Sequence, residues 1–211
     1  MVGLPAWPQG ARAMATVFKD LGESHCLHLA PHAWAEFHEP QITRGFVHFL
    51  KSGGAQQQLA RAIAFVKAAT LSAGGDHAAI DCFKPQSARC AAEEERVDIL
   101  VELRRDSNRI GAAVEAKFGH HLTSEQLPNA WRHAIEQCHW DPERSAFLVI
   151  APVATQVDGP VMRKHVERWT AISWWGFLNH LERLTDADYD CQDYRRFRRT
   201  GTVRTEGNRR K

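Results

Sequence analysis

The segment Val114-Glu115-Ala116-Lys117-Phe118 places two charged side chains inside an apolar run. In a β-strand, residues two positions apart project from the same face. Glu115 and Lys117 would therefore lie side by side on one face, with the apolar side chains on the other. A lysine beside a metal-binding carboxylate can orient or deprotonate a water, or stabilise charge on a phosphate. The simpler interpretation of the pattern is the solvated face of a half-exposed sheet.

Asp98 is a second acid in an unexpected place, because it lies within the apolar segment Val97-Asp98-Ile99-Leu100. If this segment is a strand beside that of Glu115, the two carboxylates are close enough to share one divalent cation. Mg²⁺ prefers oxygen ligands and is commonly held by one or two carboxylates, with water and phosphate oxygens completing its shell. Bound in this way it lowers the pKa of a water and neutralises charge on a reacting phosphate. The residues therefore predict a magnesium site.

The two strands that must position these side chains are expected to form a hairpin. Residues 96–103 alternate between apolar and polar side chains, residues 104–108 form a polar turn, and residues 110–118 form the second strand. Before the hairpin, helical spacing of apolar residues predicts helices near 11–21, from Pro40 to about Ser52, and over 55–69. The third of these helices is expected to bury Leu59, Ile63 and Val66. Residues 72–95 show no clear period, so we expect a loop with one weak strand near 78–83.

After the hairpin, the spacing Thr123-Ser124-Glu125-Gln126 is that of a capping box and predicts a helix reaching about Cys138. The apolar run 146–151 predicts a strand covered on both faces. A short helix after Gly159-Pro160, an edge strand over 169–172 and a last helix capped by Ser173 complete the pattern. The expected fold class is α/β, with a short mixed sheet, made of the hairpin and a crossover strand, flanked by helices.

Three segments of the chain resemble a known family. Arg96-Val-Asp-Ile-Leu100, Val114-Glu-Ala-Lys-Phe-Gly119 and Ser124-Glu-Gln-Leu127 are similar to the core of the PD-(D/E)XK nuclease superfamily. The likeness is greatest to its small bacterial branch, in which a Gln-Leu pair opens the helix after the lysine strand. Val97 stands where the name of the motif has proline. The resemblance implies a restriction-endonuclease-like core and hydrolysis of phosphodiesters with Mg²⁺ or Mn²⁺.

The same resemblance implies roles for individual residues. Asp98 and Glu115 become metal ligands, Lys117 becomes the catalytic lysine, and Gln126 positions water or phosphate. Glu39 corresponds to the acid of the first helix, which reaches the metal directly or through water; Glu36 is the rival for this role. An alternative for Glu39 is an acid that merely favours the positive end of a helix dipole.

Charge is distributed unevenly along the 211 residues. Residues 194–211 carry eight Lys/Arg and one acid, a net +7, whereas the whole chain is +2 and the first 193 residues are therefore −5. We expect a single nuclease-like domain over 1–193 and a basic tail over 194–211. Arg195, Arg196, Arg198 and Arg199 alternate with aromatic residues, a pattern typical of nucleic-acid binding. A solvated terminus, or a helix packing Tyr194 and Phe197 inward, would have the same composition.

Composition argues for a cytoplasmic protein. Hydrophobic residues make up 44% of the chain and charged residues 25%, with no membrane-spanning run and no export signal at the start. Five scattered cysteines indicate reduced thiols. Twelve histidines leave a zinc site open, but no Cys/His spacing matches a known ligand pattern.

Together these features predict a metal-dependent endonuclease in a defence or mobile-element system, and we favour DNA over RNA as its substrate. Two alternatives stay open: a non-catalytic or partner-dependent nucleic-acid-binding subunit whose protein partner supplies targeting, and an RNA-cutting toxin.

Overall fold

A computed structural model of the chain describes residues 39–95, 97–117, 122–151 and 159–184. Five strands form one sheet in the order β1-β2-β3-β4-β5. Strands β1 to β3 are antiparallel neighbours, whereas β3, β4 and β5 run parallel. The strands are β1 (Ser87–Glu94), β2 (Val97–Arg105), β3 (Asn108–Ala116), β4 (Ala146–Ala151) and β5 (Thr170–Ser173). The fold is thus α/β with a mixed sheet, as the sequence predicted.

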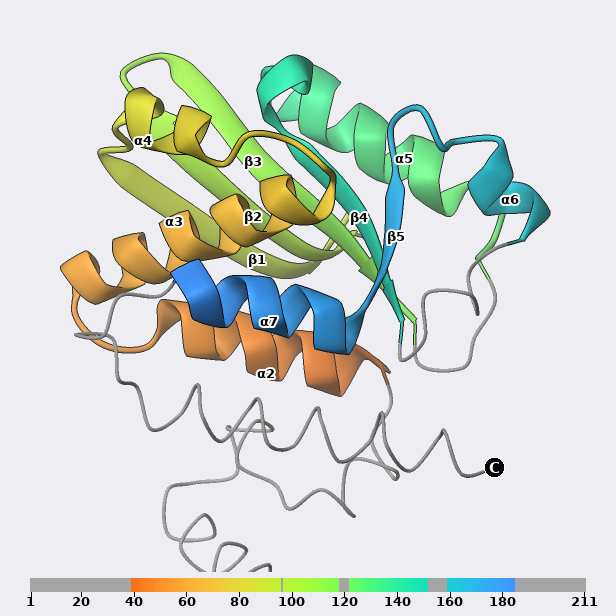
Figure 1. The fold of residues 1–211 in the computed structure, drawn as a ribbon, viewed down its shortest axis with the longest axis horizontal. Coiled ribbons are helices and arrows are strands. Elements are labelled where there is room, and N and C mark those ends of the chain that lie inside the picture. The colour runs from red at the N-terminus through yellow and green to blue at the C-terminus, as the bar shows by residue number, and fades with distance from the viewer. Residues whose placement is uncertain (1–38, 96, 118–121, 152–158, 185–211) are drawn as a thin grey trace, which may run out of the picture.

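Helices cover both faces of this sheet (Figure 1). One face carries α2 (Glu39–Lys51), α3 (Ala55–Ser72), α4 (Ala78–Phe83) and α7 (Trp174–Leu184). The other carries α5 (Gln126–Arg132), which continues into a π-helical segment over His133–Gln137, and α6 (Pro160–Arg163). A 3-10 turn over Pro142–Arg144 leads into β4. Within these described residues, no helix is long and apolar enough to cross a membrane.

The hairpin predicted around the candidate site is confirmed, with a tighter turn than expected. Ile99 pairs with Val114, and the ladder continues to Arg105 opposite Asn108, which leaves two residues in the turn. The first of them, Asp106, has a φ of 53°, a left-handed conformation that Asp tolerates better than most residues. The polar stretch that suggests a long turn in the sequence therefore belongs largely to the paired strands.

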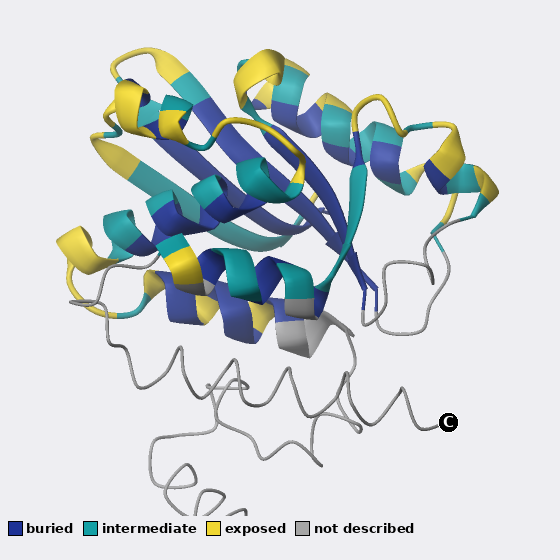
Figure 2. Ribbon diagram, in the orientation of Figure 1, coloured by how far each residue is buried: buried dark blue, intermediate teal, exposed yellow. Residues whose placement is uncertain are grey.

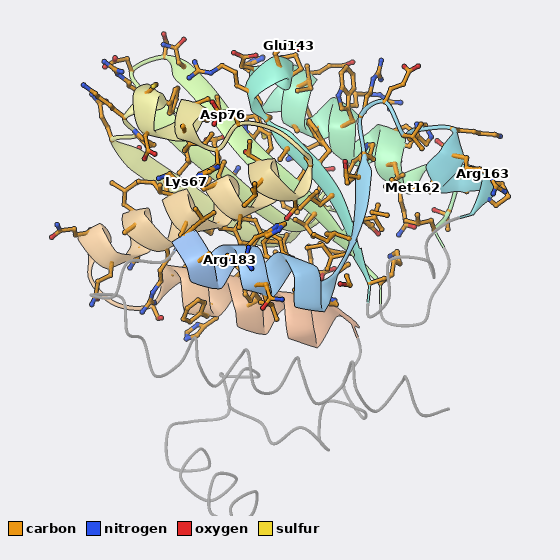
Figure 3. The ribbon with its side chains drawn as sticks, viewed as in Figure 1. Lys67, Asp76, Glu143, Met162, Arg163 and Arg183 are labelled. Atoms are coloured by element: carbon orange, nitrogen blue, oxygen red, sulfur yellow. The ribbon has the colours of Figure 1, made fainter. Side chains whose placement is uncertain are left out.

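The central strands are buried on both faces (Figure 2). Beneath α2, α3 and α7, the aromatic rings of Phe46, Phe65, Trp174 and Phe177 pack with centroids 5.1 to 6.3 Å apart. Aromatic pairs at such distances contribute beyond the area they bury. Exposed charges such as Glu143, Arg163 and Arg183 lie outside this core (Figure 3).

On the opposite face, a close approach requires a glycine in β3. A Cβ built on Gly111 would lie 2.5 Å from the ring of Trp140 and 2.5 Å from the Val101 carbonyl oxygen. The ring of Trp140 lies against Gly111, and its indole N–H donates to Glu102 Oε2 at 2.8 Å. Glu102, which is fully buried, also accepts from Arg104.

Two predictions before the hairpin are wrong. Residues 78–83 form the helix α4, in which Ile80 and Phe83 are buried one turn apart, and residues 87–94 form the edge strand β1. The helix is too short for its period to show in the sequence. The strand Ser87–Glu94 is rich in alanine and acid, which favour strands weakly, so its structure depends on pairing with β2.

The other predicted elements are largely confirmed. Helix α2, strand β4 and helix α6 lie where expected, and β5 is shifted by one residue. The Ser173 hydroxyl accepts from the Gly176 N–H at 3.0 Å, as an N-cap does. Helix α3 runs one turn further than predicted, and its buried stripe is Ala62, Phe65, Val66 and Ala69, whereas Leu59 and Ile63 are only half-buried. The helix expected near 11–21 lies outside the described residues.

Candidate functional site

Chemically active side chains meet at one end of the sheet, where the parallel strands β3, β4 and β5 have their carboxyl ends. Because β2 runs antiparallel to its neighbours β1 and β3, β1 also ends there and β2 begins there. Ligands of open α/β sheets bind outside the carboxyl ends of parallel strands. Asp98 at the start of β2, Glu115 at the end of β3 and Lys117 just beyond it are therefore brought to one place.

The three side chains contact one another in a buried cluster. The Nζ atom of Lys117 lies 2.7 Å from Glu115 Oε1 and 4.0 Å from Asp98 Oδ2. The side chains of Glu115, Lys117 and Asp98 are 1%, 4% and 11% exposed. The Lys117 ammonium thus contacts both carboxylates. The distance between Glu115 Oε1 and Asp98 Oδ2 therefore cannot exceed the sum of their distances to Lys117 Nζ. The face-sharing predicted for Glu115 and Lys117 is confirmed, and the solvated-face interpretation is wrong, because both side chains are buried.

Backbone contacts hold the cluster in position. Asp98 Oδ2 accepts from the Ala116 N–H at 2.7 Å, where the β2–β3 ladder has just ended. The Lys117 N–H donates to the Ile150 carbonyl at 2.7 Å, which ties the residue after β3 to β4. The first bond restricts the rotamer of Asp98, and the second fixes the backbone from which the Lys117 side chain projects.

The donor atoms of this cluster suit a cation. Two carboxylates and one ammonium are brought together on a buried strand face. The carboxylate oxygens of Asp98 and Glu115 are the donor type that Mg²⁺ and Mn²⁺ prefer.

Gln126 opens helix α5, and its side chain has a local partner. Its Oε1 accepts from the Thr123 N–H at 2.9 Å, which is half of the capping box that the sequence predicts. Pro128 falls in the first turn of α5, where proline does not break a helix. Gln126 therefore anchors the start of α5, and its predicted role toward water or phosphate stays a prediction.

The other predicted site residues are described in part or not at all. Glu39 begins α2, but its side chain is outside the described residues, as are Glu36 and the arginines of the tail. One turn after Glu39, the buried Thr43 hydroxyl donates to Glu93 Oε1 at 2.6 Å. The first half of α2 therefore lies against the end of β1, at the same end of the sheet as Asp98.

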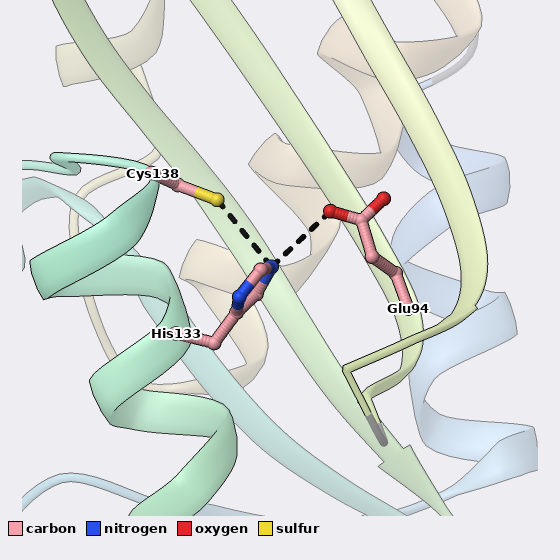
Figure 4. A group of neighbouring side chains, drawn as sticks. All are labelled: Glu94, His133 and Cys138. Atoms are coloured by element: carbon pink, nitrogen blue, oxygen red, sulfur yellow. Dashed lines mark hydrogen bonds and ion pairs between the residues drawn. The ribbon is translucent and has the colours of Figure 1, made fainter.

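Sequence reasoning missed a second cluster, formed by Glu94, His133 and Cys138 (Figure 4). His133 Nε2 lies 3.2 Å from Glu94 Oε1 and 3.5 Å from Cys138 Sγ. Burial alone would raise the pKa of Glu94, but hydrogen bonds from Arg89 and His133 hold that pKa below its usual range. Burial, followed by the charge of Glu102, raises the pKa of the Cys138 thiol.

The spacing of this second cluster could not be recognised from the sequence. Residues five apart do not share a face of an α-helix. The π-helical segment changes this, because the Cys138 N–H donates to the His133 carbonyl at 3.0 Å. Glu94 belongs to a Glu93-Glu94-Glu95 run that the sequence suggests is a solvated acidic turn. In the structure only Glu95 is exposed.

A groove of about 1010 Å³ lies between α2, the start of α3 and the edge strand β1. Its lining includes the basic side chains of Arg44, His48, Lys51 and Arg89, and Glu94 at the end nearer the site. The described part of the chain thus carries a basic surface that leads to the end of the sheet where Asp98 lies.

Comparison with family models, with curated proteins and with solved structures found no match to this chain.

Proposed function

We propose that the protein is a metal-dependent nuclease of the PD-(D/E)XK kind, with a restriction-endonuclease-like core, that hydrolyses phosphodiester bonds in DNA. The observation that carries the proposal is the buried cluster in which Lys117 Nζ lies 2.7 Å from Glu115 Oε1 and 4.0 Å from Asp98 Oδ2. Two carboxylates and a lysine ammonium gathered at the carboxyl ends of the parallel strands offer both the oxygen ligands for a divalent cation and a cationic group beside it.

Asp98 and Glu115 would hold Mg²⁺ or Mn²⁺, which when bound lowers the pKa of a water and neutralises charge on the phosphate. Lys117 has the reach to hold the attacking water, or to stabilise negative charge on the phosphate oxygens. Asp98 is kept in place by the Ala116 N–H, and Lys117 by its backbone bond to β4. The cleavage step itself is an in-line attack of water on phosphorus, with loss of the 3′ or 5′ oxygen as the leaving group.

The basic groove supports a polyanionic substrate. Arg44 and Lys51 offer two permanent positive charges along one surface, beside Arg89, which is paired with Glu94. Contacts between such charges and phosphates dominate the affinity of proteins for a phosphate backbone. The tail over 194–211 would add its net +7.

The test is cleavage of plasmid DNA and of RNA by the full chain in Mg²⁺, Mn²⁺, Ca²⁺ or EDTA. We expect cleavage of DNA in Mg²⁺ or Mn²⁺ and none in EDTA. The isosteric variant Glu115→Gln should lose about 10²-fold or more of the rate, whereas the exposed control Glu143→Gln should keep it. Cleavage of RNA alone would favour the toxin. Cleavage of neither substrate in any metal would refute the nuclease and favour a non-catalytic subunit with a protein partner.

A further inference from the structure

The second cluster brings three different donor atoms to one point. Glu94 Oε1, His133 Nε2 and Cys138 Sγ all lie within 4.8 Å of one another. A tetrahedral zinc with bonds near 2.0–2.3 Å separates its ligand atoms by roughly 3.3–3.8 Å. The two contacts of His133 Nε2, at 3.2 and 3.5 Å, already lie close to that separation. Small side-chain movements would complete the geometry.

The orientation of the His133 ring favours a ligand at Nε2. Its Nδ1 lies 2.8 Å from Gln137 Oε1 and donates to that oxygen in the tautomer that carries the proton on Nδ1. In that tautomer the lone pair of Nε2 is directed at Glu94 Oε1 and Cys138 Sγ, and the thiol S–H can donate to it in the metal-free protein. A metal ion in place of the thiol proton would have all three donor atoms around one positive centre. Metal-binding histidines are commonly oriented by an acceptor on their other nitrogen, as Gln137 does here.

The other two donors are also held in place. Arg89 binds Glu94 through Oε2, which leaves Oε1 facing His133. The π-type bond from the Cys138 N–H to the His133 carbonyl holds the thiol beside Nε2 of the ring, and π-helical turns occur frequently at functional sites. His133 and Cys138 are buried, whereas the Glu94 side chain is 24% exposed and lines the groove. A water from the groove could thus supply a fourth ligand.

We propose that Glu94, His133 and Cys138 bind one Zn²⁺ ion through Oε1, Nε2 and Sγ, with water as the fourth ligand. This site is separate in chemistry from the oxygen site of Asp98 and Glu115, because nitrogen and sulfur donors select zinc over magnesium. Binding replaces the thiol proton of Cys138, which passes to the buffer, with a sulfur–zinc bond. The ion would fasten the end of the edge strand β1 to the π-helical segment that follows α5.

Cobalt is the probe, because Co²⁺ takes zinc sites and reports its ligands by absorbance. The full chain, reduced and stripped of metal, is titrated with Co²⁺. We expect a thiolate-to-cobalt charge-transfer band and strong tetrahedral visible bands that saturate at one equivalent and disappear when Zn²⁺ is added. Cys138→Ser should abolish the charge-transfer band. The matched control Cys82→Ser, at an exposed cysteine, should keep it.

A second measurement does not depend on the folding of the cysteine variant. In wild-type protein, micromolar Zn²⁺ should raise the thermal midpoint by several degrees, because a ligand that binds only the folded state stabilises it. Millimolar Mg²⁺ should not reproduce this shift in Glu115→Gln protein, in which the oxygen site is impaired. Absence of a thiolate band in wild type, or its survival in Cys138→Ser, would overturn the proposal. The contacts of His133 with Glu94 and Gln137 would then be hydrogen bonds of a metal-free cluster.

Discussion

The first cluster is built on the neighbouring strands β2 and β3, from Asp98, Glu115 and, just after β3, Lys117. The second cluster is built at the end of the edge strand β1, from Glu94, and on the π-helical segment packed over it, from His133 and Cys138. The first cluster offers oxygen donors and an ammonium; the second offers oxygen, nitrogen and sulfur. This difference in donors suits the first to Mg²⁺ or Mn²⁺ and the second to Zn²⁺. It also means that each cluster can be disabled without removing the ligands of the other.

The largest expected effect follows from replacing the ammonium in the central cluster. Lys117→Met keeps the length of the side chain but removes its charge, so DNA cleavage should fall by about 10²–10⁴-fold. Cobalt absorbance at the second cluster should be unchanged, since no ligand there is altered. Circular dichroism would verify the fold. Cleavage at the wild-type rate would remove Lys117 from the mechanism, and loss of the cobalt bands as well would show that the clusters are coupled.

Stability should also distinguish the central strands from the edge. Glu102 in β2 is fully buried and accepts from Trp140 and Arg104. Glu102→Ala leaves the indole N–H buried without an acceptor and should lower the free energy of unfolding by about 2–4 kcal/mol. Glu94→Ala at the edge should cost about 1 kcal/mol or less in the presence of EDTA, because its carboxylate is partly solvated. Urea unfolding measures both, and equal losses would contradict the difference in burial.

The hairpin that carries the first cluster could be predicted for a physical reason. Period-two alternation is a local property of the chain, and Asp98 and Glu115 stand out because each is an acid within an otherwise apolar run. The run over 146–151 marks a buried strand just as directly. The roles of these residues are proposals, and the structure supplies the contacts between them.

The second cluster could not be predicted, because its parts acquire their positions from tertiary contacts. Strand β1 has little strand propensity of its own and is held by β2. His133 and Cys138 meet only because the segment after α5 is π-helical, so that a backbone hydrogen bond joins residues five positions apart. Glu94 resembles a solvent-exposed acid until Arg89 and His133 are placed beside it.

A third prediction concerns the glycine beneath Trp140, on the face shared by both clusters. Gly111→Ala would set a Cβ 2.5 Å from the indole ring and from a strand carbonyl, so the ring that reaches Glu102 must move. We expect a loss of about 1–3 kcal/mol in the free energy of unfolding. Gly54→Ala is the matched control, since a Cβ there meets nothing within 4 Å; it should cost less than about 1 kcal/mol. A neutral Gly111→Ala would show that the packing of Trp140 is not tight.

The smallest expected effect concerns His180, which lies outside both clusters. It measures how much of the pH dependence of stability comes from a group that belongs to neither cluster. Burial, with a further contribution from the nearby Arg183, lowers the pKa of His180 on α7, whose Nδ1 lies 2.9 Å from the hydroxyl of Ser72 on α3. Because the folded-state pKa is below the unfolded value near 6.5, the unfolded chain binds a proton more readily as the pH falls. The stability that His180 contributes is therefore complete above that value and decreases as the pH falls through it. In His180→Gln protein, the difference in thermal midpoint between pH 8 and pH 5 should be smaller than in wild type. A difference of the same size would assign the acid response to other groups.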